Sequence, residues 1–246
     1  MIETIAPEWD SPARVRALCT TRVGGESPAP YDEFNLGMHL GDDVECVARN
    51  RARLREQMNL PAEPDWIRQT HGIRAVVLES DRDRDADAAI TRQPGRVAAV
   101  MVADCLPLLV CNRGGSEVAA IHAGWRGLRA GVIASALDAM QSPPDALQAW
   151  IGPAISQAHF EVGDEVYSAF VEASPESGRC FVANRRGHWL CDLRAIARQQ
   201  LAGYGVATIE CDSHCTYRDR DLFFSYRRDG LTGRQAAMIW IEAALK

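Results

Sequence analysis

Apolar side chains recur every three or four residues in two segments of the chain, residues 42–59 and 128–140. This spacing places them along one face of an α-helix, so each segment is predicted to be helical. Asp42 and Glu45 stand three positions apart, like a capping pair at the start of the first helix. Pro61 lies beyond the end of that helix, where a proline is expected.

Two further helices are predicted in the second half of the chain, at residues 163–173 and 192–202. Asp192 suits the N-cap of the later helix, because its side chain can accept a hydrogen bond from a free backbone amide. Gly203 and Gly205 suit its end, because glycine readily adopts the left-handed conformation found there.

Short apolar runs rich in β-branched residues predict the strands. The runs at residues 96–103 and 106–111 lack the alternation of apolar and polar residues that is typical of a strand with one solvent-exposed face. Strands of this kind are typically buried on both faces, so a central sheet is expected. The predicted strands are residues 75–78, 96–103, 106–111, 117–123, 206–210 and 235–244.

The order of these elements predicts a mixed α/β (α+β) fold in a single domain, residues 1–246. No repeat, low-complexity tract or flexible linker divides the chain. In the sequence AAIHAGWRGL, residues 119–128, a predicted strand ends and a predicted helix begins. Such strand-to-helix turns often carry sites in α/β proteins, so this one is a candidate.

Length, composition and charge narrow the function classes. The 246 residues, 47% of them hydrophobic, are enough to bury one large core. The net charge of −6 provides no overall basic field for nucleic acid or an anionic membrane. No window reaches the roughly 18 apolar residues that span a bilayer, and no export signal is recognisable, so we expect a cytoplasmic protein with reduced cysteines. The charged run at residues 79–88 is interpreted as a solvated loop.

Two histidines and one cysteine stand at predicted strand ends beside small residues: His71 in QTHG, Cys105 in ADCLP and His122 in IHAG. Two imidazoles and a thiolate suit zinc or copper, and three protein ligands leave a position open for water or substrate. Such a metal would lower the pKa of a bound water and polarise a substrate atom. The wide spacing equally allows three unrelated structural residues, or a pair in which an imidazole holds Cys105 as a nucleophilic thiolate.

Other polar residues in these motifs have open roles. Asp104 is a candidate proton acceptor, an acceptor for a ligand imidazole, or a cap of its own loop. Arg126 lies near a predicted helix N-terminus, where backbone amides and a guanidinium favour an anion. Arg22 and Arg51 are further candidates for anion binding. The cluster CDSHC at residues 211–215 has no partner cluster and is interpreted as ordinary strand-end residues.

An ordered set of motifs runs through the chain: TTRVGG, YDEFNLGMHLGDD, ARNRARL, QTHG, ADCLPLLVC, VAAIHAGWRGL, IGPAI, FEVGDEV, CTYRD and FFSYRRDGLTGR. From about residue 15 to the C-terminus, the chain closely resembles the YfiH family of bacterial proteins. These are also called laccase-domain proteins or multicopper polyphenol oxidases. The motif order across the whole chain argues against chance similarity.

The resemblance implies a layered α/β/β/α sandwich with mixed sheets, similar to a bacterial toxin deamidase fold. It implies that His71, Cys105 and His122 are metal ligands, with zinc the usual metal and copper an alternative. The candidate catalytic residues are these three together with Asp104. Thr70 departs from the family pattern, in which an apolar residue more often precedes the histidine. The candidate residues for binding substrate or phosphate are Arg22, Asn35, Arg51, Gln69 and Arg126.

The activity implied by the resemblance is zinc-dependent phosphorolysis of adenosine, inosine, guanosine and methylthioadenosine, with deamination of adenosine. The partners would be a nucleoside and phosphate, and a monomer is favoured. An alternative hypothesis is a hydrolase that removes a wrongly incorporated amino acid from a peptidoglycan precursor. A copper oxidase is disfavoured because no H-x-H ligand pair occurs among the six histidines. A metal-stabilised interaction module is also disfavoured, because structural zinc normally takes four protein ligands.

Overall fold

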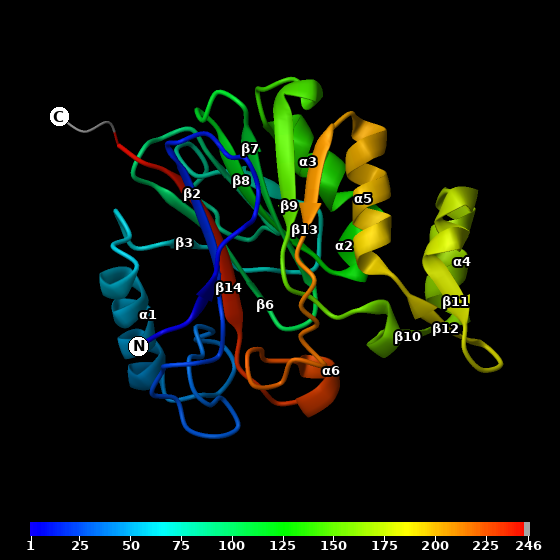
Figure 1. Ribbon diagram of the computed structural model, residues 1–246, viewed down its shortest axis with the longest axis horizontal. Coiled ribbons are helices and arrows are strands. Elements are labelled where there is room, and N and C mark those ends of the chain that lie inside the picture. Colours follow the sequence, from blue (N-terminus) through cyan, green and yellow to red (C-terminus); the bar gives the residue numbers. More distant parts are fainter. Residues whose placement is uncertain (244–246) are drawn as a thin grey trace.

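The structure is a computed structural model, and it describes residues 1–243. Two β-sheets lie face to face and helices cover the outer face of each, which gives four layers in the order α/β/β/α (Figure 1). The predicted fold class, a single mixed α/β domain, is therefore confirmed. Over the described residues, no helix is both long enough and apolar enough to cross a membrane.

The first sheet brings the two ends of the chain together, because an early strand pairs antiparallel with the last one. In order, its strands are β1 (Thr4–Ile5), β2 (Val15–Thr20), β14 (Gln235–Ile241), β6 (Val97–Val102) and β3 (Asp65–Trp66). Only β3 and β6 run parallel. The helix α1 (Val44–Gln57) covers its outer face, where Leu54 packs in one cluster with Leu18 and Met238.

The second sheet has six strands and lies at the centre of the molecule (Figure 1). In order, they are β13 (Thr208–Cys211), β9 (Leu147–Ile151), β7 (Leu106–Asn112), β8 (Val118–Ala123), β5 (Ala88–Thr91) and β4 (Ala75–Val77). The pairs β13–β9 and β4–β5 are parallel, and the others are antiparallel. The sheet is therefore mixed.

Strands β7 and β8 are buried on both faces, as their unbroken apolar runs predict. Leu108 and Ile121 belong to the core under the outer helices, whereas Leu109 and Ala120 belong to the core between the two sheets. Full burial of one large aliphatic side chain contributes about 1.5–3 kcal/mol. These two strands therefore hold the inner and outer layers together.

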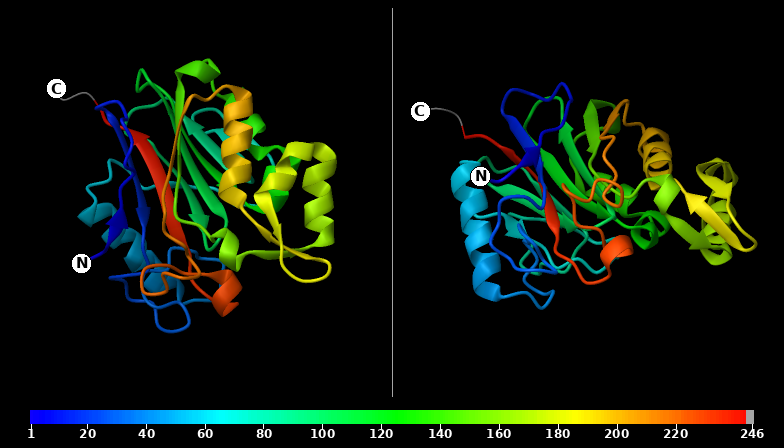
Figure 2. Two further views of the ribbon diagram at one scale, coloured as in Figure 1. Left: turned by 45° about the vertical axis from the view of Figure 1, so that its right-hand side comes forward. Right: turned by 60° about the horizontal axis from the view of Figure 1, so that its bottom comes forward.

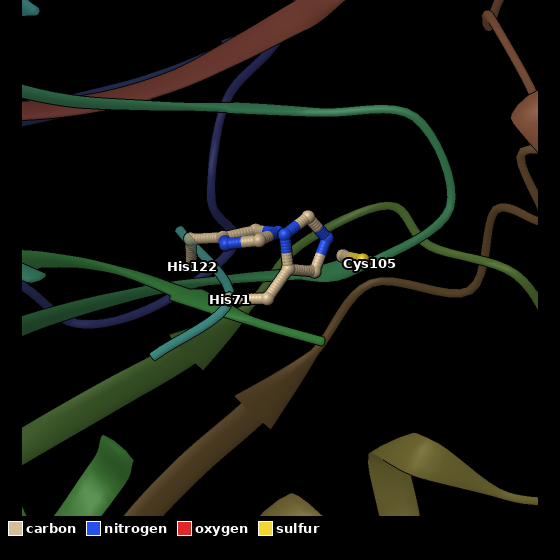
Figure 3. Close-up of side chains that lie close together, drawn as sticks. All are labelled: His71, Cys105 and His122. Carbon is tan, nitrogen blue, oxygen red and sulfur yellow. The ribbon is translucent and has the colours of Figure 1, made fainter. Parts of the chain in front are cut away.

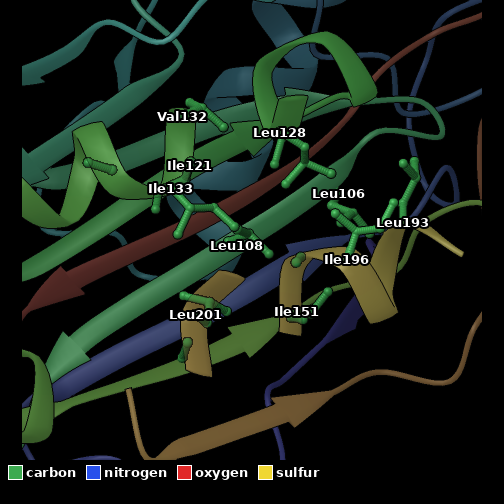
Figure 4. Packing of buried hydrophobic residues seen from close by; sticks show 14 of the residues in the cluster. Leu106, Leu108, Ile121, Leu128, Val132, Ile133, Ile151, Leu193, Ile196 and Leu201 are labelled. Carbon is green, nitrogen blue, oxygen red and sulfur yellow. The ribbon is translucent and has the colours of Figure 1, made fainter. Parts of the chain in front are cut away.

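Three helices cover the outer face of the second sheet: α2 (Trp125–Ala130), α3 (Val132–Ala139) and α5 (Leu193–Tyr204). Leu128, Val132 and Ile133 pack there with Ile196 and Leu201 (Figure 4). The close packing of these side chains fixes the start of α2, which follows directly on β8.

The prediction of one helix over residues 128–140 is wrong, because the segment forms two short helices. Gly131 has a φ of 99°, which lies in the left-handed region that favours glycine. It ends α2 and precedes the first residue of α3. Apolar spacing continues through the break, so periodicity alone cannot detect it.

The capping residues are predicted correctly in one helix and displaced by one position in another. The N-cap of α1 is Asp43, whose side chain accepts a hydrogen bond from the backbone amide of Glu45 at 2.8 Å. Asp42, the predicted cap, instead bonds within the preceding loop. Asp192 caps α5, and Gly205 ends it with a φ of 107°, as predicted.

A third, small sheet extends from one side of the molecule (Figure 2). Its antiparallel strands are, in order, β10 (Glu161–Gly163), β12 (His188–Cys191) and β11 (Phe181–Ala183). Helix α4 (Asp164–Ala173) packs beside it, and Tyr167 stacks on Trp189 with ring centroids 3.8 Å apart. Strands of three or four residues carry no periodic signal, so the sequence predicts only the helix.

The remaining helical segments are short: α6 (Tyr226–Asp229) and the 3-10 turns Pro144–Ala146, Gln157–His159 and Pro175–Cys180. The strand predicted at residues 206–210 is β13, which begins two residues later. The strand predicted at residues 235–244 is β14, and residue 244 lies outside the described residues.

Candidate active site

The fold brings together three side chains that lie far apart in the sequence: His71, Cys105 and His122 (Figure 3). Their candidate donor atoms all lie within 4.8 Å of one another. The pairing of β7 with β8 explains part of this meeting, since Pro107 stands opposite His122 and Cys105 lies just before β7. His71 comes from the loop between β3 and β4.

A buried carboxylate, Asp87, connects that loop to β8. Its Oδ1 accepts hydrogen bonds from His122 Nδ1, at 2.8 Å, and from the amide of His71, at 3.0 Å. Its Oδ2 accepts from the amides of Thr70 and Gly72 and from the Thr70 hydroxyl. Because Nδ1 of His122 is occupied in this way, Nε2 is left as its donor atom for the site.

Asp87 carries its charge in spite of being fully buried. Burial alone would raise its pKa, but the hydrogen bonds from His122 and from the amides of Gly72 and Thr70 lower it to about 2. Asp87 belongs to the run at residues 79–88, which was interpreted as a solvated loop. That interpretation is wrong at this position. The available signal was that Asp87 directly precedes the apolar strand β5.

Asp104, the predicted acceptor for a ligand imidazole, bonds elsewhere. Its Oδ1 accepts a hydrogen bond from Thr216 Oγ1 at 2.6 Å, and its Oδ2 accepts from the amide of Arg227 at 2.7 Å. Asp104 therefore joins the turn before Cys105 to Thr216 and Arg227. These contacts correspond to the alternative in which Asp104 stabilises its own loop. The acceptor for His122 is Asp87 instead.

The electrostatics of the three side chains favour a thiolate. Burial would raise the pKa of Cys105, but the neighbouring rings of His122 and His71 lower it to about 6. Burial would likewise lower the pKa of His122, but Cys105 and Asp87 raise it to about 9. The contact between the two side chains therefore favours the thiolate form of Cys105 and the protonated form of His122.

The backbone around the site is strained and closely packed. His71 and Asp104 have positive φ values of 59° and 97°, which cost energy for residues other than glycine. Gly124 lies so close to the site that a Cβ there would stand 3.0 Å from Cys105 Sγ and 3.2 Å from His71 Cδ2. A side chain at this position would require the two candidate ligands to shift by a few tenths of an ångström, so the site favours glycine here.

The donor set fits a metal ion. Two imidazole nitrogens and one thiolate are ligands that zinc and copper accept, and three protein ligands leave one position of a tetrahedral site open. Over residues 1–243, no other group of three such side chains brings its donor atoms together in this way. In the cluster at residues 211–215, His214 is hydrogen-bonded to Asp212, and the sulfur of Cys215 accepts a hydrogen bond from Ser156. These side chains therefore contact protein atoms and do not point their donor atoms at a common centre. All eight cysteines are free.

The three side chains lie in a cavity of about 720 Å³. Two of the predicted substrate residues, Arg51 and Gln69, line it. Both polar ends of the Gln69 amide pair with the backbone of Met101, at 2.7 and 2.8 Å, so Gln69 fixes the cavity wall. Besides these two and the three candidate ligands, the cavity is lined by Met38, His39, Trp66, Ile67, Arg68, Met101, Val102, Ala103, Tyr226 and Arg234.

The other three predicted substrate residues do not line this cavity. Arg22 lies at a second cavity of about 580 Å³ and forms an ion pair with Asp32. Asn35 is fully buried, and its amide holds the backbone of Arg234 and the loop before α1. Arg126 is exposed and lies over the ring of Trp125, 4.6 Å from its centroid.

Comparisons with known proteins agree with this architecture. Residues 16–242 match the model of a family described as multi-copper polyphenol oxidoreductase laccase. The chain is 45% identical over 243 residues to "Purine nucleoside phosphorylase YfiH" of Shigella flexneri, covering 98% of this chain and 100% of that protein. It is 45% identical over 239 residues to "Purine nucleoside phosphorylase PA4543" of Pseudomonas aeruginosa, covering 97% and 98%.

Solved structures show the same fold. The crystal structure of Neisseria meningitidis protein NMB0706 is 44% identical, with a TM-score of 0.92 over 98% of this chain and 99% of that one. The crystal structure of YlmD from Geobacillus stearothermophilus is 31% identical, with a TM-score of 0.86 over 98% and 100%. The similarity therefore extends over the whole domain and includes the segments that carry His71, Cys105 and His122.

Proposed function

Because the chain belongs to the YfiH family, we propose that it is a purine nucleoside phosphorylase that acts at His71, Cys105 and His122. The observation that carries this proposal is the 45% identity to relatives of that name over nearly the full length of both chains. The substrates are then a purine nucleoside and inorganic phosphate.

In phosphorolysis, an oxygen of phosphate forms a bond to C1′ of the ribose while the bond from C1′ to the purine nitrogen breaks. The purine leaves with the electron pair of that bond. The site must therefore hold phosphate next to C1′ and stabilise negative charge on the base. A cavity of about 720 Å³ beside the three side chains is large enough for a nucleoside.

We propose zinc as the resident metal, held by His71, Cys105 and His122, because two imidazoles and a thiolate form a donor set that zinc accepts. When bound, zinc supplies a Lewis acid beside the substrate. The chain supplies the rest of the arrangement: Asp87 orients the ring of His122, and Gly124 leaves the space between the ligands free.

The experiment is a phosphorolysis assay on purified protein whose metal content is known. Inosine with phosphate should release hypoxanthine and ribose 1-phosphate, and inosine without phosphate should not. Cys105→Ala should abolish turnover, while the matched control Cys211→Ala should retain it, because Cys211 lies outside the site. The proposal fails if the wild type releases no hypoxanthine, or if Cys105→Ala is fully active.

We also propose adenosine deamination as a second activity, because a three-ligand site leaves a position open for water beside the base. Adenosine without phosphate should then yield inosine and no adenine.

Hydrolysis of an amide in a cell-wall precursor is the competing hypothesis, and the low pKa of Cys105 would suit it. Activity that survives chelation but not Cys105→Ser would favour that thiol chemistry over a metal site.

A further inference from the structure

Two largely buried arginines, Arg51 and Arg234, line the cavity of the three candidate ligands. Arg51 comes from α1, and Arg234 immediately precedes β14, so different layers of the fold supply them. Among the residues that the structure describes, no carboxylate oxygen lies within 4.0 Å of either guanidinium. A buried charge without a partner is costly, and such groups are usually paired or bind a ligand.

Arg51 is held firmly but keeps one amino group free. Its Nε and Nη2 donate to the carbonyl of Leu36 at 3.0 and 2.7 Å, and its guanidinium lies over Trp66, 4.1 Å from the ring centroid. The negative charge of Glu63 favours the protonated form of Arg51, but the Glu63 carboxylate accepts a hydrogen bond from the indole of Trp66 and none from Arg51. Burial nevertheless lowers the pKa of Arg51 to about 10. Its Nη1 has no hydrogen-bond partner within residues 1–243.

Arg234 is held in a similar way at the start of β14, in the sheet that α1 covers. Its Nη1 donates to the carbonyls of Thr232 and Gly233 at 3.0 and 2.9 Å, and its backbone amide donates to buried Asn35. No described residue accepts a hydrogen bond from its Nε or Nη2. Burial lowers its pKa, and the nearby charge of Cys105 partly offsets this effect.

The two guanidinium groups act on the same region of the cavity. His39, which also lines it, has a lowered pKa because it is partly buried and because both Arg234 and Arg51 repel a proton there. Arg68 lines the same cavity but differs from them, because it is exposed and pairs with Asp85. Of the three arginines that line the cavity, Arg51 and Arg234 are therefore the two that form no ion pair with a carboxylate of the described residues.

We propose that Arg51 and Arg234 together bind the phosphate co-substrate. A tetrahedral oxyanion can accept hydrogen bonds from Nη1 of Arg51 and from Nε and Nη2 of Arg234, the groups that no protein atom uses. Because both arginines line the same cavity as His71, Cys105 and His122, this oxyanion would lie beside the candidate metal ligands. This assignment rests on the proposed phosphorylase function for the identity of the anion, and it adds Arg234, which the sequence did not suggest.

The first test measures binding of inorganic phosphate without nucleoside, by isothermal titration calorimetry on the zinc-loaded protein. Arg51→Gln and Arg234→Gln should each weaken phosphate binding at least about tenfold, because each removes charge-assisted hydrogen bonds. The matched control Arg55→Gln should bind as the wild type does, since Arg55 is exposed on α1 and does not line the cavity. Circular dichroism and the melting temperature of each variant show whether it is folded.

The second test measures steady-state phosphorolysis. Arg51→Lys and Arg234→Lys should raise the KM for phosphate at least about tenfold, because an ammonium cannot replace the directed donors of the guanidinium, while the KM for inosine changes less than about threefold. Unchanged phosphate affinity in folded Arg51→Gln and Arg234→Gln would overturn the proposal.

The outcomes also separate this proposal from the proposed function. Phosphate binding that depends on both arginines, in a protein that releases no hypoxanthine, would keep the anion site and reject the phosphorylase. Phosphorolysis that neither substitution affects would keep the phosphorylase and reject the anion site. Binding of uridine diphosphate without any binding of inorganic phosphate would overturn the assignment to phosphate, because the anion would then be part of a larger substrate.

Discussion

Asp87 holds the loop of His71 and the ring of His122 in position at the candidate site. Four hydrogen bonds from the segment Thr70–Gly72 and one from His122 converge on its two oxygens. One buried carboxylate thus fixes the positions of two candidate ligands that reach the site from different elements. Thr70, which departs from the family pattern, takes part through its hydroxyl as well as its amide.

Asp87→Asn should lower kcat/KM by about 10- to 100-fold, because an amide can no longer accept at both oxygens and the orientation of His122 is lost. It should also reduce stability by about 1–3 kcal/mol through the donors left without an acceptor. Enzyme assays and urea denaturation measure the two effects. Asp85→Asn is the matched control, since Asp85 is more exposed and pairs with Arg68. Equal losses in the two variants would show that Asp87 has no special role.

At the level of secondary-structure elements, Glu79 in the connection from β4 to β5 shows how a side chain can accept hydrogen bonds from backbone amides that no neighbouring strand in residues 1–243 pairs with. The carboxylate of Glu79, just after β4, accepts hydrogen bonds from the Thr91 hydroxyl and from the amides of Arg92 and Gln93, at 2.8 and 2.9 Å for the amides. Burial would raise its pKa, but these bonds lower it below the usual value of 4.5. The ionised form is therefore favoured in the folded protein.

This lowered pKa predicts a pH dependence with a definite sign. The stability that Glu79 contributes is present above about pH 4.5 and is lost as the pH falls through its folded-state pKa. Glu79→Gln should therefore reduce the difference in melting temperature between about pH 6 and pH 3. Glu56→Gln, at an exposed position of α1, should leave that difference unchanged. An acid sensitivity that is the same in Glu79→Gln and wild type would contradict the prediction.

For the whole molecule, a metal bound at the candidate site would join segments that otherwise meet through the core and through the hydrogen bonds of Asp87 and Asp104. A metal that binds the folded chain adds its binding free energy to folding stability, about 4 kcal/mol at 1,000 times its Kd. Zinc should therefore raise the melting temperature of the metal-free protein by roughly 10 °C. The shift should be small in Cys105→Ala and retained in Cys211→Ala. A shift of equal size in Cys105→Ala would place the bound zinc elsewhere.

The linear sequence is sufficient to predict many of the elements and the mixed α/β class, because binary patterning is a local property, whereas the layered arrangement was implied by the resemblance to the YfiH family. The unbroken apolar runs of β6 and β7 indicate strands buried on both faces, and Asp192 marks the start of α5. Motif order identified the family and, through it, His71, Cys105 and His122 as a set. Strands β2, β5 and β9 of the two main sheets, the break at Gly131 and the strands of the third sheet were missed. A single φ value and a three-residue strand leave no periodic signal.

Tertiary structure alone determined which polar residues share a cavity. Arg22 and Arg51 were equal candidates in the sequence, but only Arg51 reaches the cavity of the candidate ligands. Arg234 carried no local signal, and Asp87 carried only its place directly before the apolar strand β5, because the importance of both depends on partners that are distant in the chain. Whether an arginine or an aspartate is buried, paired or free is a property of its surroundings. Strand pairing and layer packing create those surroundings, and no short segment specifies them.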